Sequence, residues 1–235
     1  EFRRVLFRSL GVTALITNVA IQKTTFKYEI PYMLLITAVL LVMGMTGNEI
    51  TFIEGVILWI LFIAYLLYLY FLAKKGNDSG DEQSVKLYPV WKCLLFIVLG
   101  GVCVVIGSQL VVNGATTIAR ACGMSERFIG LTIVAFGTSL PELVTSVSAA
   151  RKGNAGIAIG NIVGSNIFNI LFVIGTVALI CPVPFESRFV IDTVVAILCG
   201  VLLWGGTIRH KELRKPCGVV MLLCYAAYFV YLAAM

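Results

Sequence analysis

The chain has 235 residues, a formal net charge of +6 and a mean hydropathy of +0.98, and 60% of its residues are hydrophobic. This composition excludes an ordinary soluble domain and indicates an all-α protein that crosses a membrane several times. The basic residues lie in short loops between apolar runs, so they indicate membrane topology and imply no nucleic-acid partner. The seven cysteines are scattered without CxxC spacing, which favours packing residues over a disulfide framework or a zinc site.

The chain begins with nine residues that resemble a translated sequencing adaptor. We therefore leave residues 1–9 out of the fold prediction and expect the natural N-terminus to be missing. The next residues, Leu10–Ile16, are apolar and are predicted to be the tail of a membrane span.

Seven further apolar runs have the length that a helix needs to cross a bilayer. In chain order, the predicted spans are Ile30–Thr46, Phe52–Ala73, Tyr88–Val112, Phe128–Ala150, Ala155–Ile180, Phe189–Ile208 and Cys217–Met235. A hydrophilic linker at residues 74–87 divides these runs into two groups. The sequence therefore predicts residues 10–73 as the remainder of a first repeat and residues 88–235 as a second repeat.

Lysine and arginine residues are distributed very unequally between alternate loops. One side of the membrane receives twelve of them and the other receives three; the twelve are Lys23, Lys27, Lys74, Lys75, Lys86, Lys92, Arg151, Lys152, Arg209, Lys211, Arg214 and Lys215, and the three are Arg120, Arg127 and Arg188. Because positively charged loops stay cytoplasmic, the linker is predicted to be cytoplasmic and the C-terminus to be outside. His210 lies in a basic loop and is predicted to be solvated rather than a proton relay.

Two weak matches within the chain indicate an internal repeat. Gly11–Ile16 matches Gly175–Ile180 at an offset of 164. Gly55, Ala64, Tyr65, Tyr68 and Leu69 match Gly218, Ala227, Tyr228, Tyr231 and Leu232 at an offset of 163. Five spans, an odd number, separate the two copies, so the copies are predicted to have opposite orientations. Inverted repeats of this kind are typical of secondary transporters, which bind their substrate near the midplane at broken helices.

A polar signature interrupts the apolar region between Gly130 and Gly175. Its first part is Gly137-Thr138-Ser139-Leu140-Pro141-Glu142, which puts a carboxylate, the only acid that we place in the interior of a predicted span, at membrane depth. Pro141 removes a backbone donor and frees carbonyl oxygens in the preceding turn, and Thr138 shares a helical face with Glu142. Carboxylate, hydroxyl and carbonyl oxygens together predict a site for a hard cation.

The second part of the signature is the run Gly160-Asn161-Ile162-Val163-Gly164-Ser165-Asn166-Ile167-Phe168-Asn169. Ser165 and Asn169 are four residues apart and share one helical face, so they are predicted to offer neutral oxygen ligands. Asn161 lies one turn earlier, and Asn166 is expected to brace the backbone. For Asn161 and Asn166, the alternative that the amides only hold neighbouring helices together stays open.

The segment Gly107–Gly175, which contains this signature, resembles the second alpha-repeat of the cation/calcium exchanger superfamily, in particular the prokaryotic sodium/calcium-exchanger-like proteins. The resemblance implies cation ligation by Glu142, Thr138, Ser139, the Ala135 carbonyl, Ser165 and Asn169. It also implies a gating helix at Gly107–Ala115, a ten-span inverted-repeat transporter of which about seven spans are complete here, and a place in the bacterial inner membrane. Calcium and sodium would be transported substrates, without a prosthetic group. Since Asn169 is neutral, a second carboxylate is expected from the first repeat.

Four functions remain to be compared. The leading hypothesis is an antiporter that exchanges calcium for sodium or protons by alternating access. The same fold could instead exchange other cations, in sodium/proton or potassium-coupled transport, because these oxygen ligands suit all hard cations. The chain could also be an inactive truncated product. An intramembrane enzyme with Ser139 as nucleophile is excluded, because no histidine or lysine lies in the interior of a predicted span to act as base. The oligomeric state stays open.

Overall fold

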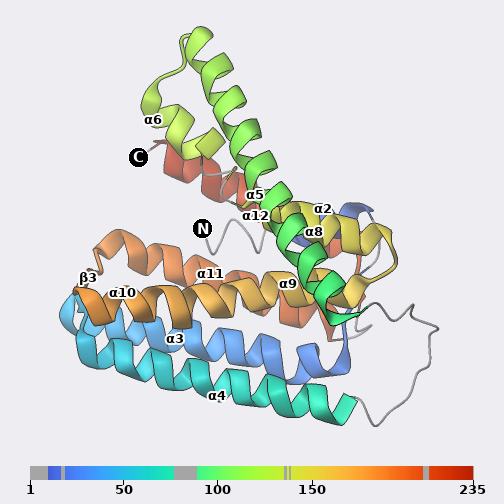
Figure 1. The fold of residues 1–235 in the computed structure, drawn as a ribbon. Helices are drawn as coiled ribbons and strands as arrows, with labels where there is room; N and C mark the ends of the chain where they lie inside the picture. The colour runs from blue at the N-terminus through green and yellow to red at the C-terminus, as the bar shows by residue number, and fades with distance from the viewer. Residues whose placement is uncertain are drawn as a thin grey trace. The chain divides into compact units, whose positions relative to one another are not determined.

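The structure, a computed structural model, describes residues 10–16, 19–76, 89–134, 137, 139–208 and 212–234. The adaptor-like residues 1–9, His210 and most of the predicted linker lie outside these ranges. Helices make up nearly all of the described chain (Figure 1). The chain forms two compact units, a larger one of Glu1–Ile60 with Glu142–Met235 and a smaller one of Leu61–Pro141.

Among the described residues, twelve helical segments and strands lie wholly within the larger unit, which also contains the start of α4 and most of α8. In chain order these are α2 (Leu10–Ile16), β1 (Val19–Ala20), η2 (Thr25–Glu29), α3 (Ile30–Gly47), β2 (Glu49–Ile50), α4 (Phe52–Gly76), α8 (Leu140–Arg151), α9 (Ala155–Phe168), η4 (Asn169–Ile174), α10 (Gly175–Ile180), β3 (Val183–Pro184), α11 (Ser187–Thr207), β4 (Glu212–Leu213) and α12 (Lys215–Ala234). The smaller unit contains the rest of α4 with α5 (Val90–Ala121), α6 (Glu126–Ile129) and η3 (Gly130–Val134).

Among the described residues, five helices are long and apolar enough to cross a bilayer. They are Thr25–Gly47, Phe52–Lys75, Val90–Ala121, Gly156–Ile180 and Phe189–Thr207, and the apolar part of α12 is the shorter Lys215–Tyr228. These helices confirm the prediction of an all-α membrane protein. The predicted span Phe128–Ala150 differs, because it is divided into α6, η3 and α8.

The outer surfaces of the helices are themselves apolar. No residue in the hydrophobic window of α5 is buried, and Leu94, Phe96, Ile97 and Val98 are all exposed. Soluble proteins rarely expose apolar patches of more than a few hundred Å², so a continuous apolar helix surface of this kind indicates contact with lipid. α5 continues nine residues past the predicted Val112 end and stops before Gly123, whose positive φ of 78° suits the end of a helix.

Two short strand pairs tie the predicted repeats together in the larger unit. β1 pairs antiparallel with β4, with Val19 opposite Leu213, and β2 pairs antiparallel with β3, with Glu49 opposite Pro184. β3 follows β1 by 164 residues and β4 follows β2 by 163, which are the offsets of the predicted repeat. Each pair therefore joins one strand of the first repeat to the non-equivalent strand of the second.

Two close helix crossings at glycines are related to each other by the same repeat offsets as the strand pairs. A Cβ placed on Gly218 would lie 2.8 Å from the Ala14 Cβ and 3.0 Å from the Gly11 carbonyl oxygen, so α12 and α2 touch through their backbones. A Cβ placed on Gly55 would lie 3.0 Å from the Ala178 Cβ and 3.1 Å from the Gly175 carbonyl oxygen. Small residues let helices approach this closely in membranes. The glycines that match in sequence thus form two equivalent crossings, as an inverted repeat requires.

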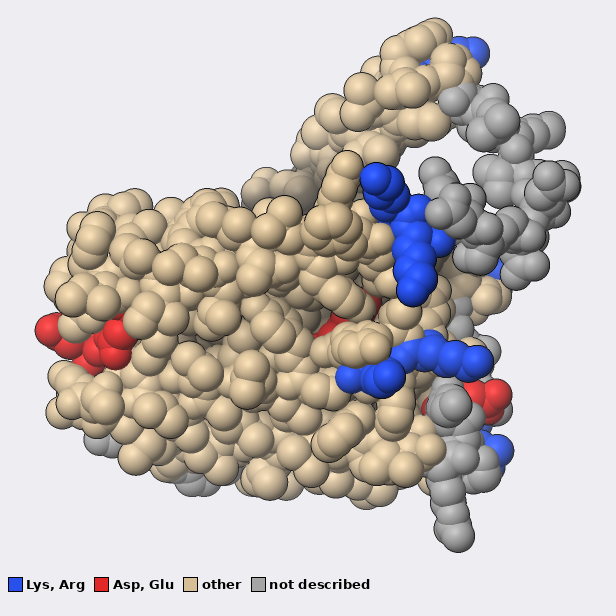
Figure 2. All heavy atoms as spheres, turned by 90° about the horizontal axis from the view of Figure 1, so that it is seen from below, with Lys and Arg blue, Asp and Glu red and all other residues tan. Residues whose placement is uncertain are grey.

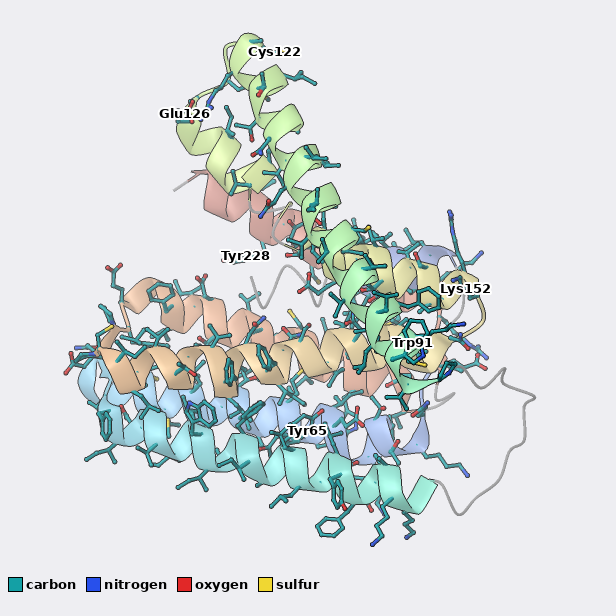
Figure 3. The ribbon with its side chains drawn as sticks, viewed as in Figure 1. Tyr65, Trp91, Cys122, Glu126, Lys152 and Tyr228 are labelled. Carbon is teal, nitrogen blue, oxygen red and sulfur yellow. The ribbon has the colours of Figure 1, made fainter. Side chains whose placement is uncertain are left out.

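Charged residues separate toward the two ends of the larger unit. Helix α3 has Lys23 and Lys27 before it and Glu49 after it, and Lys152 lies in the turn before α9 (labelled in Figure 3). Glu186 follows β3, at the end where β2 and β3 pair. Figure 2 shows a group of acidic side chains at the left of the view and, at the right, basic side chains together with a smaller number of acidic ones.

Candidate functional site

The described residues around the start of the signature include a π-helical segment and a turn. The π-helical segment η3 ends at Val134, Ser139 lies in a turn, and α8 starts at Leu140 with Pro141 as its second residue. Proline is tolerated in the first turn of a helix, where its missing N–H would have had no partner. A second π-helical segment, η4, starts at Asn169. Single π turns inside helices occur frequently at functional sites, because they widen the helix and redirect side chains.

The six predicted ligands are distributed between the two units. Ala135 and Thr138 lie outside the described residues, and Ser139 belongs to the smaller unit. Ser139 is buried, and its Oγ has no hydrogen-bond partner among the described residues. Glu142, Ser165 and Asn169 belong to the larger unit, where their surroundings can be compared directly.

Glu142 lies in the first turn of α8, and its Oε2 is buried. This carboxylate oxygen has no hydrogen-bond partner among the residues that the structure describes. A buried polar atom without a partner costs roughly 1–3 kcal/mol, and more when it is charged. The first turn of a helix favours a negative charge, but it does not by itself satisfy a buried oxygen. Glu142 therefore presents an anionic acceptor that a bound cation would satisfy.

Asn161 holds α9 against α8 close to this carboxylate. Its Nδ2 lies 3.3 Å from the Glu142 carbonyl oxygen, 2.9 Å from Thr145 Oγ1 and 3.1 Å from Ser146 Oγ. Ser146 Oγ in turn donates to the Ala158 carbonyl oxygen at 3.3 Å. Such contacts are typical of polar residues that join helices within a membrane. Of the two readings left open for Asn161, the contacts favour the one in which the amide joins the helices.

Two other polar side chains of α9 donate hydrogen bonds to a carbonyl oxygen of the same helix. Ser165 Oγ donates to the Ile162 carbonyl oxygen at 3.0 Å, and Asn166 Nδ2 donates to the same oxygen at 2.7 Å. Because the hydrogen of Ser165 is used within the helix, the lone pairs of its oxygen remain available to a cation. Asn166 is fully buried and its Oδ1 has no partner among the described residues. Its amide braces the backbone, as expected, while its oxygen stays unsatisfied.

Asn169 faces a cavity that the sequence did not predict. The cavity has a volume of about 270 Å³, and its polar lining consists of Thr37, Asn169, Asp192 and Thr193. Asp192 Oδ1 accepts a hydrogen bond of 2.6 Å from Tyr228 on α12. Asp192 lies near the start of the predicted span Phe189–Ile208, is the sixth residue of α11 and is half-buried, so Glu142 is not the only acid with a place at a span. The repeat offset relates Tyr228 to Tyr65, and this recurring tyrosine was the signal that could have drawn attention to its partner Asp192.

The smaller unit brings the predicted gating helix against the break. Ser108, Gln109 and Asn113 of α5 line a second cavity of about 270 Å³ together with Gly137 and Pro141. Val112 fills the space that a side chain on residue 137 would need, so glycine is required there. The polar face of α5 therefore packs on the helix break, while the opposite face of α5 is apolar and exposed.

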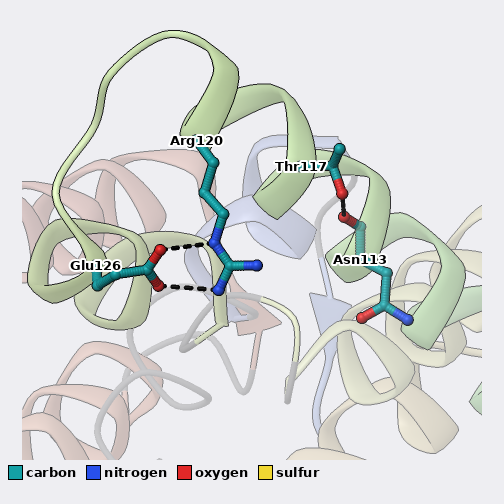
Figure 4. A network of polar contacts seen from close by, with 4 residues as sticks. All are labelled: Asn113, Thr117, Arg120 and Glu126. Carbon is teal, nitrogen blue, oxygen red and sulfur yellow. Dashed lines mark hydrogen bonds and ion pairs between the residues drawn. The ribbon is translucent and has the colours of Figure 1, made fainter.

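An exposed ion pair closes the turn between α5 and α6 (Figure 4). Arg120 donates from Nε and Nη2 to the two carboxylate oxygens of Glu126, at 2.6 and 2.9 Å. Hydrogen bonding to Arg120 holds the pKa of Glu126 below its ordinary value. Both side chains are largely exposed, so solvent screening leaves this pair little effect on stability. Thr117 Oγ1 donates to the Asn113 carbonyl oxygen at 2.9 Å one turn earlier.

Comparison with known proteins places this architecture in a family of transporters. The model of the sodium/calcium exchanger protein family matches residues 92–234. The putative antiporter CaxA of Alkalimonas amylolytica is 34% identical over 229 residues, covering 93% of this chain and 72% of the relative. The inner membrane protein YrbG of Escherichia coli is 31% identical over 230 residues, covering 90% and 68%. A solved structure of the sodium-calcium exchanger NCX_Mj soaked with zero Na⁺ and Ca²⁺ superposes with a TM-score of 0.80 at 31% identity, covering 98% of this chain and 73% of that one.

The fold and the site define a secondary transporter built from inverted repeats, and the matches agree with it at the level of sequence and of structure. The chain belongs to the sodium/calcium exchanger family. The resemblance expected from the signature is thereby confirmed. Family members are transporters rather than enzymes, which agrees with the expectation of no enzymatic activity.

Proposed function

We propose that this chain carries the second-repeat ion site of a secondary active antiporter that exchanges calcium for sodium or protons. The observation that carries the proposal is the buried Glu142 Oε2, which has no protein partner among the described residues. A charge held at membrane depth needs a counter-charge, and a transported cation supplies one only while it is bound. Family membership and the NCX_Mj fold support the same function.

The proposed ligand set is Glu142, Thr138, Ser139, the Ala135 carbonyl, Ser165 and Asn169. All of these are oxygen donors, as calcium and sodium prefer. Ser139 and Glu142 support the assignment because each has a buried oxygen without a partner among the described residues. A single carboxylate does not neutralise a divalent ion, so we expect the remaining charge from the first repeat's copy of the signature. Alternating access would then expose the shared site to each side in turn.

Competition between calcium and sodium tests this function. In the protein expressed from its complete reading frame, purified in detergent, calcium binding is expected to weaken steadily as sodium is raised, because both cations use the same oxygens. Choline at equal ionic strength serves as the control. If calcium does not bind, the proposed exchange site is wrong. If sodium and choline have the same effect on calcium binding, sodium is not the exchanged ion.

We also propose that the protein lies in the bacterial inner membrane with the β1–β4 end of the larger unit in the cytoplasm. The unequal distribution of lysine and arginine supports this orientation. The native Cys181, which is exposed, and Lys152 lie at opposite ends of the Gly156–Ile180 span. They therefore report on opposite sides of the membrane.

Labelling of single cysteines checks the orientation. In right-side-out vesicles, a membrane-impermeant maleimide should label a variant that keeps only Cys181. A variant with Lys152→Cys as its only cysteine should react only after the vesicles are permeabilised. The reverse pattern would show that the orientation is inverted.

A further inference from the structure

Asn161 connects α9 to the backbone of the residue that carries the proposed charged ligand. Its Nδ2 lies 3.3 Å from the backbone carbonyl oxygen of Glu142, 2.9 Å from Thr145 Oγ1 and 3.1 Å from Ser146 Oγ. Glu142 therefore belongs to this network through its backbone and to the proposed ligand set through its carboxylate. Because the backbone and the side chain of one residue move together, the network bears directly on the position of the carboxylate.

The three groups that face the Asn161 amide are all acceptors. A backbone carbonyl has no hydrogen to donate. Thr145 Oγ1 donates its hydrogen to the Glu142 carbonyl oxygen at 3.1 Å, and Ser146 Oγ donates its hydrogen to the Ala158 carbonyl oxygen at 3.3 Å. An NH2 group brings two hydrogens to these acceptors, whereas a carboxylate or an alkyl side chain brings none. The surroundings therefore specify an amide at this position and not merely a side chain of its size.

The same contacts fix how α8 and α9 are aligned along their length. The two helices are joined by a short turn and run antiparallel. Ser146 contacts Ala158, and Glu142, one turn before Ser146, contacts Asn161, one turn after Ala158. Ser165 lies one further turn along the same face of α9. Contacts that resist sliding of one helix along the other therefore also keep the spacing between Glu142 and Ser165.

The spacing between ligands decides which cation a site prefers. Oxygen sites distinguish cations by the size of the cavity, the number of ligands and the flexibility of the ligands. A site whose ligands are held at a fixed spacing suits an ion of one size, whereas a site whose ligands can move apart also accepts a larger ion. Glu142 and Ser165 come from different helices, so contacts between these helices supply the rigidity of their spacing.

We propose that Asn161 is a positioning residue of the exchange site and that its contacts with α8 set the size of the cation that the site prefers. The inference rests on the proposed function, because it assigns Glu142 and Ser165 to one cation site. Asn161 acts through the backbone of Glu142. Loss of its amide therefore loosens the site without removing a ligand, so divalent binding persists while the preference for calcium over the larger barium ion declines.

Equilibrium binding measures this preference without requiring transport. Radiolabelled calcium is bound to the purified protein from its complete reading frame and is displaced with barium, and the ratio of the two affinities gives the preference. Asn161→Leu removes both donors, and Asn161→Asp replaces the NH2 group by an oxygen, whose added charge attracts both ions alike. Each change is expected to lower the ratio about threefold to tenfold, which is the scale of one hydrogen bond.

Asn154→Asp is the matched control. Asn154 precedes the same helix, is exposed and makes no capping hydrogen bond with its side chain, so the same change of amide to carboxylate should leave the preference unchanged. The melting temperature in detergent separates positioning from packing. An Asn161 variant that is less stable but keeps the preference for calcium would show that the amide only joins the helices, and it would overturn the proposal.

Ser146→Ala is a milder test of the same network. It removes one acceptor of the Asn161 amide together with the contact to Ala158, and it is expected to lower the ratio in the same direction. If neither Asn161 variant purifies as a folded protein, Ser146→Ala decides the question, and an unchanged ratio overturns the proposal. Failure of the unaltered protein to bind calcium would instead overturn the proposed function, and this inference with it.

Discussion

Replacing Glu142 by glutamine should abolish calcium transport while the protein still inserts and folds. Glutamine has the same shape but no charge, so the helix packing of α8 is kept and the electrostatic attraction for the cation is lost. Removing one partner of a buried charge pair costs about 3–5 kcal/mol, which corresponds to a loss of affinity of roughly a hundred- to several thousandfold. Radiolabelled calcium uptake into vesicles of equal protein content is the measurement.

The matched control is Glu186→Gln, which removes an exposed carboxylate from the same unit. Its transport rate should equal that of the unaltered protein, which would show that loss of a negative charge as such does not matter. Normal uptake by a folded Glu142→Gln protein would disprove the role of Glu142 as the charged ligand.

The second large effect is expected at the glycine crossing of α12 and α2. Gly218→Val would put a Cβ within 2.8 Å of the Ala14 Cβ and 3.0 Å of the Gly11 carbonyl oxygen. Backbone atoms cannot move aside as a flexible side chain can, so the helices must separate. Overpacking of this kind costs about 1–3 kcal/mol, and we expect a clear drop in the melting temperature measured in detergent.

Gly205→Val is the control for this prediction, because a Cβ on Gly205 would have no atom within 4 Å. Both changes replace a helical glycine by the same residue, so the difference between them reports the crossing alone. Gly55→Val should behave like Gly218→Val, since the inverted repeat makes the two crossings equivalent. Equal melting temperatures for Gly218→Val and Gly205→Val would contradict the close packing.

The helical fold could be predicted because lipid imposes a length and an apolar composition on every span. The repeat could be predicted for a related reason. Where helices cross at backbone distance only glycine fits. The repeat is therefore recognisable because glycine itself recurs, at Gly11 and Gly175 and at Gly55 and Gly218, and not only because apolar residues recur. The strand pairs were not predicted, because two-residue strands leave no recognisable pattern in sequence.

The candidate site was predicted only in part. Glu142 and the break near Pro141 were found because a carboxylate and a proline contrast with an apolar background. Asp192 was missed because it lies close to the beginning of α11, where an acid is expected to reach the membrane surface. Its hydrogen bond to Tyr228 depends on the packing of α12 against α11, which no local pattern encodes. The π-helical turn at Asn169 was missed for a similar reason, because it depends on packing around η4.

The central claim is that the protein couples calcium movement to the opposite movement of another cation. The most direct test is calcium uptake into vesicles that contain the protein from its complete reading frame, with sodium and proton gradients imposed one at a time. The account predicts calcium accumulation against its own gradient only when sodium or protons flow outward, and no accumulation when all gradients are collapsed. Calcium entry that follows its own gradient at the same rate, whatever the sodium and proton gradients, would indicate a passive pathway and would contradict the account.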